Sequence, residues 1–165
     1  MSHPKVLPAD VLDDVRRLVE SEELGEAYFG TAARLARTEA HRRRWTALRD
    51  LEIRTNRAVT RFIERTELVV APTNRAARVV GTGAGTGGLL MPDSVHLKLL
   101  KAGTGRYLPA FRRLADYFRE TDDAAFFDYV VNHELAIIAC ADGALRDDRD
   151  ALDPVLRLLD RPLDV

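Results

Sequence analysis

The 165-residue chain has one cysteine, few glycines and prolines, and no apolar run that approaches the roughly 20 residues of a transmembrane helix. A single cysteine, Cys140, cannot form an internal disulfide, and the first ten residues lack the apolar stretch of a signal peptide. Ten glycines and seven prolines are too few for a collagen-like or low-complexity chain. We therefore expect one soluble, cytoplasmic domain covering residues 1–165, with no membrane partner.

Charge is unevenly distributed along the chain, although its formal net value is only −1. Residues 34–78 carry twelve arginines and five acids, a net charge of +7, whereas residues 116–165 carry five arginines and thirteen acids, a net charge of −8. Basic stretches can bind nucleic acid. Because acidic and basic segments of similar size can neutralise each other within one fold, we do not expect a nucleic-acid partner.

Apolar residues recur at the three- and four-residue steps of amphipathic helices, and convincing strand alternation is absent. The pattern predicts four long helices, at about residues 8–40, 42–66, 92–120 and 122–147, and a short tail helix at about 154–160. The first and last pairs are joined by only a few residues, which favours two antiparallel hairpins. A glycine-rich link of over twenty residues joins the second helix to the third. The expected fold is all-α, a four-helix bundle with one long crossover.

Two features interrupt this helical pattern. Gly83-x-Gly85-x-x-Gly88 matches the dinucleotide-binding fingerprint, but the strand and helix that this motif requires are missing, so we interpret it as part of the crossover. Pro109 lies inside the third helix and cannot bond to the carbonyl of Gly105, which predicts a kink near residues 106–107.

Polar residues occupy buried positions near the middle of each predicted helix. The second helix has Glu52 and Thr55 on its apolar seam, and the third has Tyr107. On the first helix Glu26 lies on the apolar stripe, although Glu22 or Glu23 would face inward if the register slipped. On the fourth helix the pair His133 and Glu134 replaces an apolar pair. Antiparallel packing would bring Glu26, Glu52, Tyr107, His133 and Glu134 into one layer.

Several carboxylates buried together raise each other's pKa and cost several kcal/mol of desolvation each. Such a layer persists if the acids share protons, if a protein cation such as Arg106 enters, or if a metal ion neutralises them. The sequence leaves a hydrogen-bonded network and a metal or ligand site open as alternatives. A third alternative is an enzyme that uses the acids for general acid–base chemistry.

The chain resembles the ferritin-like superfamily, the bundles that include ferritins and rubrerythrins. The likeness rests on ELGEAYF at 23–29, LEIRT at 51–55, NHE at 132–134 and the long second–third connection. The resemblance implies a ferritin-like bundle that binds iron or manganese in its core and carries out O₂- or peroxide-linked oxidation. The implied metal ligands are Glu26, Glu52, His133 and Glu134, with Thr55 and Tyr107 as supporting hydrogen-bonding groups.

The chain departs from the family pattern of two Glu-x-x-His pairs, because Thr55 replaces one His and Val130 replaces one Glu. At most four ligands remain where a two-metal site needs six, so the expectation is a partial mid-bundle site for one or two iron or manganese ions. The alternative function is a non-catalytic helical bundle whose buried polar network supports dimerisation or partner binding. We expect a homodimer, since two-fold dimers are the commonest assembly, and no particular protein partner is indicated.

Overall fold

The computed structural model describes residues 7–70 and 91–163, and within these ranges all regular secondary structure is helical. The all-α prediction is therefore confirmed for the described residues. The helices are α1 (Ala9–Leu35), α2 (Glu39–Thr66), α4 (Asp93–Gly105), α5 (Leu108–Phe118), α6 (Ala124–Leu145) and α7 (Asp153–Asp160). The first two helices are separated by three residues, and Thr38 starts α2 by accepting a hydrogen bond from the backbone N–H of His41.

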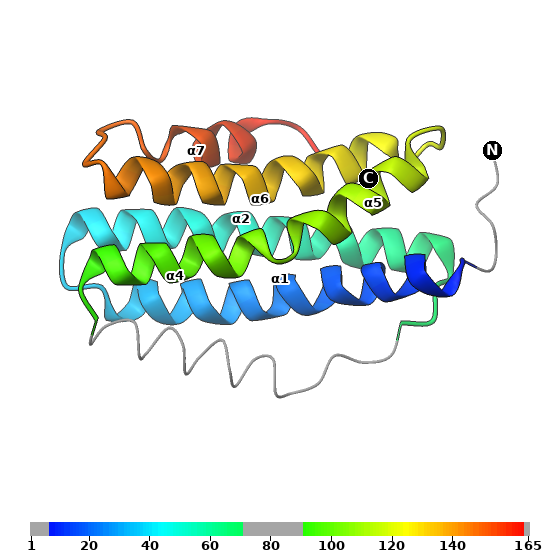
Figure 1. Cartoon of the computed structure of the whole chain (residues 1–165), viewed down its shortest axis with the longest axis horizontal. Helices are drawn as coiled ribbons and strands as arrows, with labels where there is room; N and C mark the ends of the chain where they lie inside the picture. Colours follow the sequence, from blue (N-terminus) through cyan, green and yellow to red (C-terminus); the bar gives the residue numbers. More distant parts are fainter. Residues whose placement is uncertain (1–6, 71–90, 164–165) are drawn as a thin grey trace.

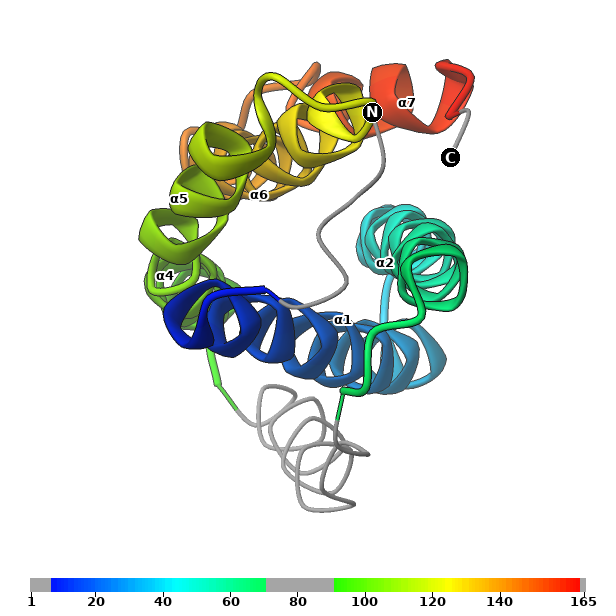
Figure 2. The same ribbon diagram turned by 90° about the vertical axis from the view of Figure 1, so that its right-hand side faces the viewer.

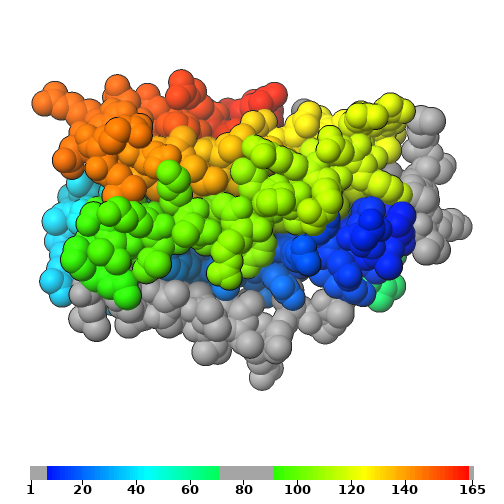
Figure 3. All heavy atoms as spheres, viewed as in Figure 1, coloured from blue at the N-terminus to red at the C-terminus, as the bar shows by residue number. Residues whose placement is uncertain are grey.

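Two helical hairpins pack side by side along the length of the bundle (Figures 1 and 2). One consists of the antiparallel helices α1 and α2, and the other of α4 with α5 followed by α6, which runs back along them. Figure 3 shows α4 and α5 lying across one face, between α6 and α1. The end of α2 and the start of α4 lie at opposite ends of the bundle. The predicted crossover and its glycine motif fall mainly on residues 71–90, outside the described residues.

The expected third helix is two helices, α4 and α5, which meet at Arg106 and Tyr107. The N–H groups of these two residues bond to the carbonyls of Gly103 and Thr104, three residues back, instead of continuing the α-helical ladder. Pro109 then occupies the first turn of α5, where its missing N–H leaves no ladder bond unmade. The predicted kink at residues 106–107 is therefore confirmed.

Polar contacts connect the elements outside the core. Asp14, buried on α1, receives two hydrogen bonds of 2.8 Å from the guanidinium of Arg113 on α5. Arg65 at the end of α2 pairs with the buried Asp123 before α6, which joins the basic and acidic segments of the sequence. The tail helix α7 packs on α6 and α2. Arg54 of α2 donates to the backbone carbonyls of Leu159 and Arg161, which holds the end of α7 in place.

The core consists of two apolar clusters with a polar layer between them. One cluster gathers around Phe29, Trp45 and Ile137, and the other around Phe62 and Phe127. Between them lie the buried polar side chains of Glu22, Glu52, Thr55, His133 and Glu134. This is the layer that the sequence predicts at mid-height in the bundle, and it is where a functional site would form.

The apolar helix α6 forms the central wall of this core. Its 22 residues are long and apolar enough to cross a membrane by length and composition, and 56% of its most apolar window is buried inside the bundle. A buried core helix passes the same test, so this property is weak support for a membrane segment. Cys140 of α6 is also buried, and burial raises the pKa of its thiol to about 11, so little reactive thiolate forms at neutral pH.

Candidate metal centre

Three ionisable side chains from three helices meet in the polar layer: Glu22 of α1, Glu52 of α2 and His133 of α6. They are 0%, 4% and 0% exposed. Nδ1 of His133 lies 3.7 Å from Oε1 of Glu22, and Nε2 lies 3.4 Å from Oε1 of Glu52. One potential ligand atom from each residue falls within 4.8 Å of the others. This spacing is close enough for small side-chain rotations to bring the three groups around one ion.

The geometry of this cluster leaves four buried polar atoms without a well-formed hydrogen bond among the described residues. Neither oxygen of Glu22 and neither ring nitrogen of His133 has a hydrogen-bond partner among the described residues, and all four atoms are buried. Most buried polar atoms in proteins are paired, and an unpaired one costs about 1–3 kcal/mol. Glu52 contacts both Glu22 and His133, so a partly satisfied hydrogen-bond network, one alternative that the sequence leaves open, remains compatible with the cluster.

The electrostatics of the cluster favour bound protons or a cation. Burial raises the pKa of Glu22 well above its usual value, and the neighbouring charges of Glu52 and Glu134 raise it further. Burial also raises the pKa of Glu134 to about 8, although His133 opposes the change. Burial lowers the pKa of His133, but the charge of Glu52, a hydrogen bond to Glu52 and the charge of Glu134 together outweigh this effect, so the pKa is raised. At neutral pH the cluster therefore holds protons that a divalent cation could replace.

Gly25 explains why the Glu52 carboxyl can lie against α1. A Cβ atom at position 25 would lie 2.5 Å from Cδ of Glu52 and 2.7 Å from each of its oxygens. Real Cβ atoms do not approach this closely, so any larger residue would displace the carboxyl. The glycine thus admits Glu52 to the centre.

The structure brings together Glu52 and His133 of the predicted set, with Glu134 buried beside them. It places Glu26 outside this group, one turn along α1 from Glu22, where it is half-buried and accepts a 3.1 Å hydrogen bond from Nδ2 of Asn56. Glu22, one of the alternatives that the sequence left open, occupies the inward position instead. The contacts of α1 with the other helices determine which of its faces turns inward. Gly25 is the clearest signal in the sequence for that inward face.

The two supporting residues occupy different surroundings. Thr55 is fully buried, but its hydroxyl donates to the carbonyl of Leu51 at 3.0 Å and lies 3.2 Å from the hydroxyl of Tyr129. It therefore supports Tyr129, and the structure shows no hydrogen bond from it to a carboxylate among the described residues. Tyr107 is half-buried on the same side of the bundle as Glu134. The pKa of Tyr107 is raised mainly by desolvation, next by the charge of Glu20, and to a smaller extent by the charge of Glu134.

Comparisons with known proteins identify no relative of this chain. No family model, curated protein or solved structure matches the chain. The ferritin-like assignment, the homodimer and the cytoplasmic location therefore stay predictions. What supports a function is the geometry of the centre itself.

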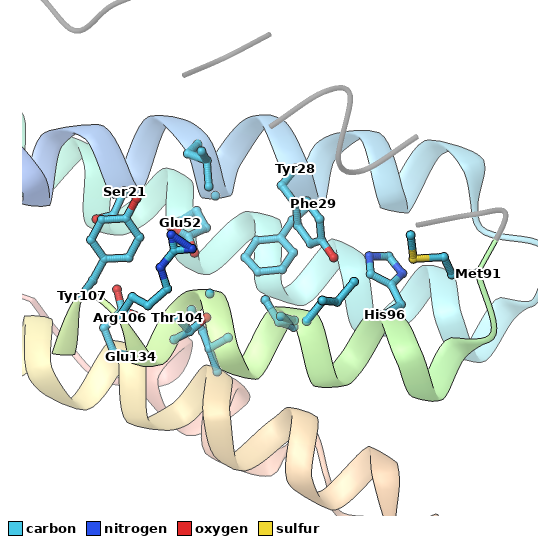
Figure 4. A pocket seen from close by; sticks show the side chains of 16 residues that line it. Ser21, Tyr28, Phe29, Glu52, Met91, His96, Thr104, Arg106, Tyr107 and Glu134 are labelled. Carbon is cyan, nitrogen blue, oxygen red and sulfur yellow. The ribbon is translucent and has the colours of Figure 1, made fainter. Parts of the chain in front are cut away.

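A cavity of about 440 Å³ leads to the centre from the space between α1 and α4 (Figure 4). Glu52 and Glu134 contribute to its wall, together with Arg106, Tyr107 and Thr104 at the same end. In Figure 4 the side chain of Arg106 extends toward Glu52, and Tyr107 lies beside Ser21. The carboxylates of the centre can therefore be reached by a small molecule from this cavity.

Proposed function

We propose that the protein binds one divalent metal ion, iron or manganese, through Glu22, Glu52 and His133. The observation that supports this most directly is the set of four buried, unpartnered polar atoms on Glu22 and His133. A cation placed there would be bound by lone pairs of the Glu22 carboxylate and of one His133 ring nitrogen, because the other nitrogen of a neutral imidazole keeps its proton. It would also neutralise the negative charges that raise the pKa of the two glutamates.

The donor set suits these ions. Carboxylate oxygens favour manganese and other hard cations, and imidazole suits iron, zinc and copper. Glu134 brings a further carboxylate, so the centre offers four donors, fewer than the six of a two-metal site in ferritin-like proteins. One ion with open coordination positions is the assignment that fits this number.

A ferritin-like relationship is part of the same proposal. Its support is the arrangement of two antiparallel hairpins, the opposed positions of the end of α2 and the start of α4, and the carboxylate–histidine layer at mid-height. When iron or manganese is bound, the ion supplies a redox-active centre that can react with O₂ or peroxide. The chain's own buried residues would hold the ion, and the cavity lined by Glu52 and Glu134 would give small molecules access to it.

Metal content provides the test. Purified protein without an affinity tag is loaded anaerobically with Mn(II) or Fe(II), dialysed and analysed for metal, and Mn(II) binding is measured by isothermal titration calorimetry. We expect about one ion per chain. Glu22→Gln keeps the size of the side chain but weakens a carboxylate ligand, so its affinity should fall at least tenfold. His133→Gln should behave in the same way.

The matched control is Glu26→Gln, one turn away on the same helix. Its carboxylate is bonded to Asn56 outside the centre, so we expect metal affinity within twofold of the native value. Equal losses in Glu22→Gln and Glu26→Gln, or no ion bound to the native protein under any loading, would contradict the proposal.

A non-catalytic bundle is the second candidate, because the polar layer separates two apolar clusters and could fix the register of the helices. Replacing Glu22 and His133 together by leucine distinguishes the candidates. A structural layer predicts loss of a unique fold. A metal site predicts a folded, metal-free protein of equal or greater stability, as happens when buried ion pairs are replaced by apolar residues.

A further inference from the structure

The cavity between α1 and α4 extends well beyond the metal centre. Its 440 Å³ lies within the range of small-molecule sites in proteins and has room for on the order of ten to fifteen non-hydrogen atoms. Between its two ends the wall is mainly apolar, with Leu24 and Phe29 from α1, Leu99 and Leu100 from α4, and Ile137 from α6. A molecule that filled this middle part would need an apolar body.

The end farther from the centre carries a polar atom without a partner. His96 of α4 lines the cavity and is only 6% exposed, and its Nε2 atom is buried with no hydrogen-bond partner in the part of the chain that the structure describes. Its ring packs against Tyr28 and Trp45, with centroids 5.3 and 4.7 Å apart, which fixes its direction. Figure 4 shows the Tyr28 hydroxyl on the side of the cavity that faces His96.

A hydroxyl is the group that complements this end of the cavity. Burial lowers the pKa of His96, so the imidazole is neutral near pH 7 and its Nε2 is either a donor or an acceptor. A hydroxyl can serve either form, because it both donates and accepts, whereas an ether oxygen can only accept. A carboxylate would bring a charge that the neutral ring does not compensate.

We propose that this cavity binds an elongated, mainly apolar alcohol or phenol whose hydroxyl hydrogen-bonds to Nε2 of His96 and whose other end lies near Glu52 and Glu134. The placement of that second end beside a metal ion rests on the proposed function. Binding in the apolar part and at His96 does not. The ligand class therefore follows from the two ends of one cavity, with an apolar wall between them.

The test compares two isomeric probes, 1-octanol and heptyl methyl ether, which have the same number of non-hydrogen atoms. Binding to the full-length, Mn(II)-loaded protein is followed by ligand-observed NMR and isothermal titration calorimetry. We expect 1-octanol to bind about tenfold more tightly to the native protein than to His96→Phe, the difference expected for one hydrogen bond to a buried partner, and to bind the native protein at least as tightly as the ether does. In His96→Phe, which keeps an aromatic ring, 1-octanol should no longer bind more tightly than the ether.

Gly103 offers a variant that fills the cavity without disturbing the fold. It lines the cavity, and a Cβ atom placed there meets nothing within 4 Å. Gly103→Phe should therefore reduce binding of both probes at least tenfold. Gly105 lies two residues further on, also has open space around a Cβ and is not a lining residue, so Gly105→Phe is the matched control and should bind both probes like the native protein.

The same samples separate this proposal from the metal proposal. Gly103→Phe should retain its Mn(II), and Glu22→Gln, which has weakened metal binding, should bind 1-octanol as tightly as the native protein does. Native protein that binds neither probe, or that binds 1-octanol no more tightly than His96→Phe does, would overturn the cavity proposal and leave the metal proposal standing. Probe binding that survives in Gly103→Phe would overturn it too. Circular dichroism and thermal unfolding establish that each variant is folded.

Discussion

The polar layer and the aromatic end of the bundle differ in how well their groups are satisfied. At the aromatic end Phe62, Phe118 and Phe127 pack ring against ring, with centroids 4.3 to 5.7 Å apart. In the polar layer the equally buried Glu22 and His133 leave four polar atoms unpaired. One region stabilises the fold through contacts that are complete. The other leaves buried polar atoms that lower stability unless protons or a bound cation compensate them.

The largest expected effect is the pH dependence of the metal-free protein. The folded-state pKa of Glu134, raised to about 8 by burial, lies above the usual value of 4.5, and that of Glu22 is raised as well. Stability from these protonated groups is fully present below about pH 4.5 and is lost as the pH rises through 8. The free energy of unfolding, measured by urea titration at pH 5 and pH 9, should fall by on the order of 5 kcal/mol. Saturating Mn(II) should remove most of this difference, and a metal-free protein that is more stable at pH 9 would contradict the assignment.

Truncating a ring at the aromatic end should reduce stability and leave the centre unaffected. Phe127 is fully buried, stacks on Phe118 at 4.3 Å and contacts Phe62 edge to face at 5.1 Å. Phe127→Ala should lower the free energy of unfolding by about 3–5 kcal/mol, as typical for a buried ring. Urea titration gives the loss and calorimetry with Mn(II) gives the affinity below the unfolding temperature. Metal affinity that fell together with stability would show that the two regions are not separate.

Gly25→Ala should reduce both the free energy of unfolding and the affinity for metal, by a smaller amount. Its Cβ would overlap the Glu52 carboxyl, so we expect a loss of about 1–3 kcal/mol, typical for an overpacked site, together with weaker Mn(II) binding. Gly30→Ala on the same helix is the control, because its Cβ would meet only Cδ of Arg49 at 3.8 Å. That variant should be stabilised by about 0.5–1 kcal/mol, since alanine favours helix over glycine. Similar stability changes in the two variants would rule out the packing argument.

The smallest effect is expected at Thr55. Its hydroxyl donates to the Leu51 carbonyl, so Tyr129 donates to it, and Thr55→Val would leave the buried tyrosine hydroxyl without this partner. A loss of about 1 kcal/mol is typical for one such hydrogen bond. Tyr129→Phe tests the same bond from the other side. Mn(II) affinity should be unchanged in both, whereas a marked decrease would restore Thr55 to the supporting hydrogen-bonding role at the metal site that the family resemblance implies.

Much of the site could be predicted where a polar residue interrupts a clear apolar rhythm. Glu52 lies in the regular seam of the second helix, and His133 and Glu134 replace an apolar pair in the fourth, so their burial follows from local periodicity. The break after Gly105 follows from Pro109 by the same local logic. The burial of these residues and the helix break can be predicted without knowing which helix packs opposite.

The remaining part of the site depends on tertiary contacts. The first helix carries acids at 20, 22, 23 and 26, so its inward carboxylate depends on the rotation of α1 against Glu52, where Gly25 allows close approach. His96 was missed because a lone histidine on an amphipathic helix gives no local signal. The spacing of His96 with Leu100, Gly103 and Tyr107 could have indicated its position. These residues follow one another at steps of four, three and four, so they share one helical face, and all four line the cavity.

The centre draws its donors from both hairpins, with Glu22 and Glu52 in the first and His133, 111 positions after Glu22, in the second. An ion held by all three would crosslink the two hairpins, each of which is formed by residues that are close together in the sequence. Because it binds only the docked arrangement, an ion at 100 times its Kd would add about 2.7 kcal/mol to docking. Metal supply would then set how stable the docked arrangement is, because a metal-starved chain would depend on the apolar clusters and ion pairs between the hairpins alone.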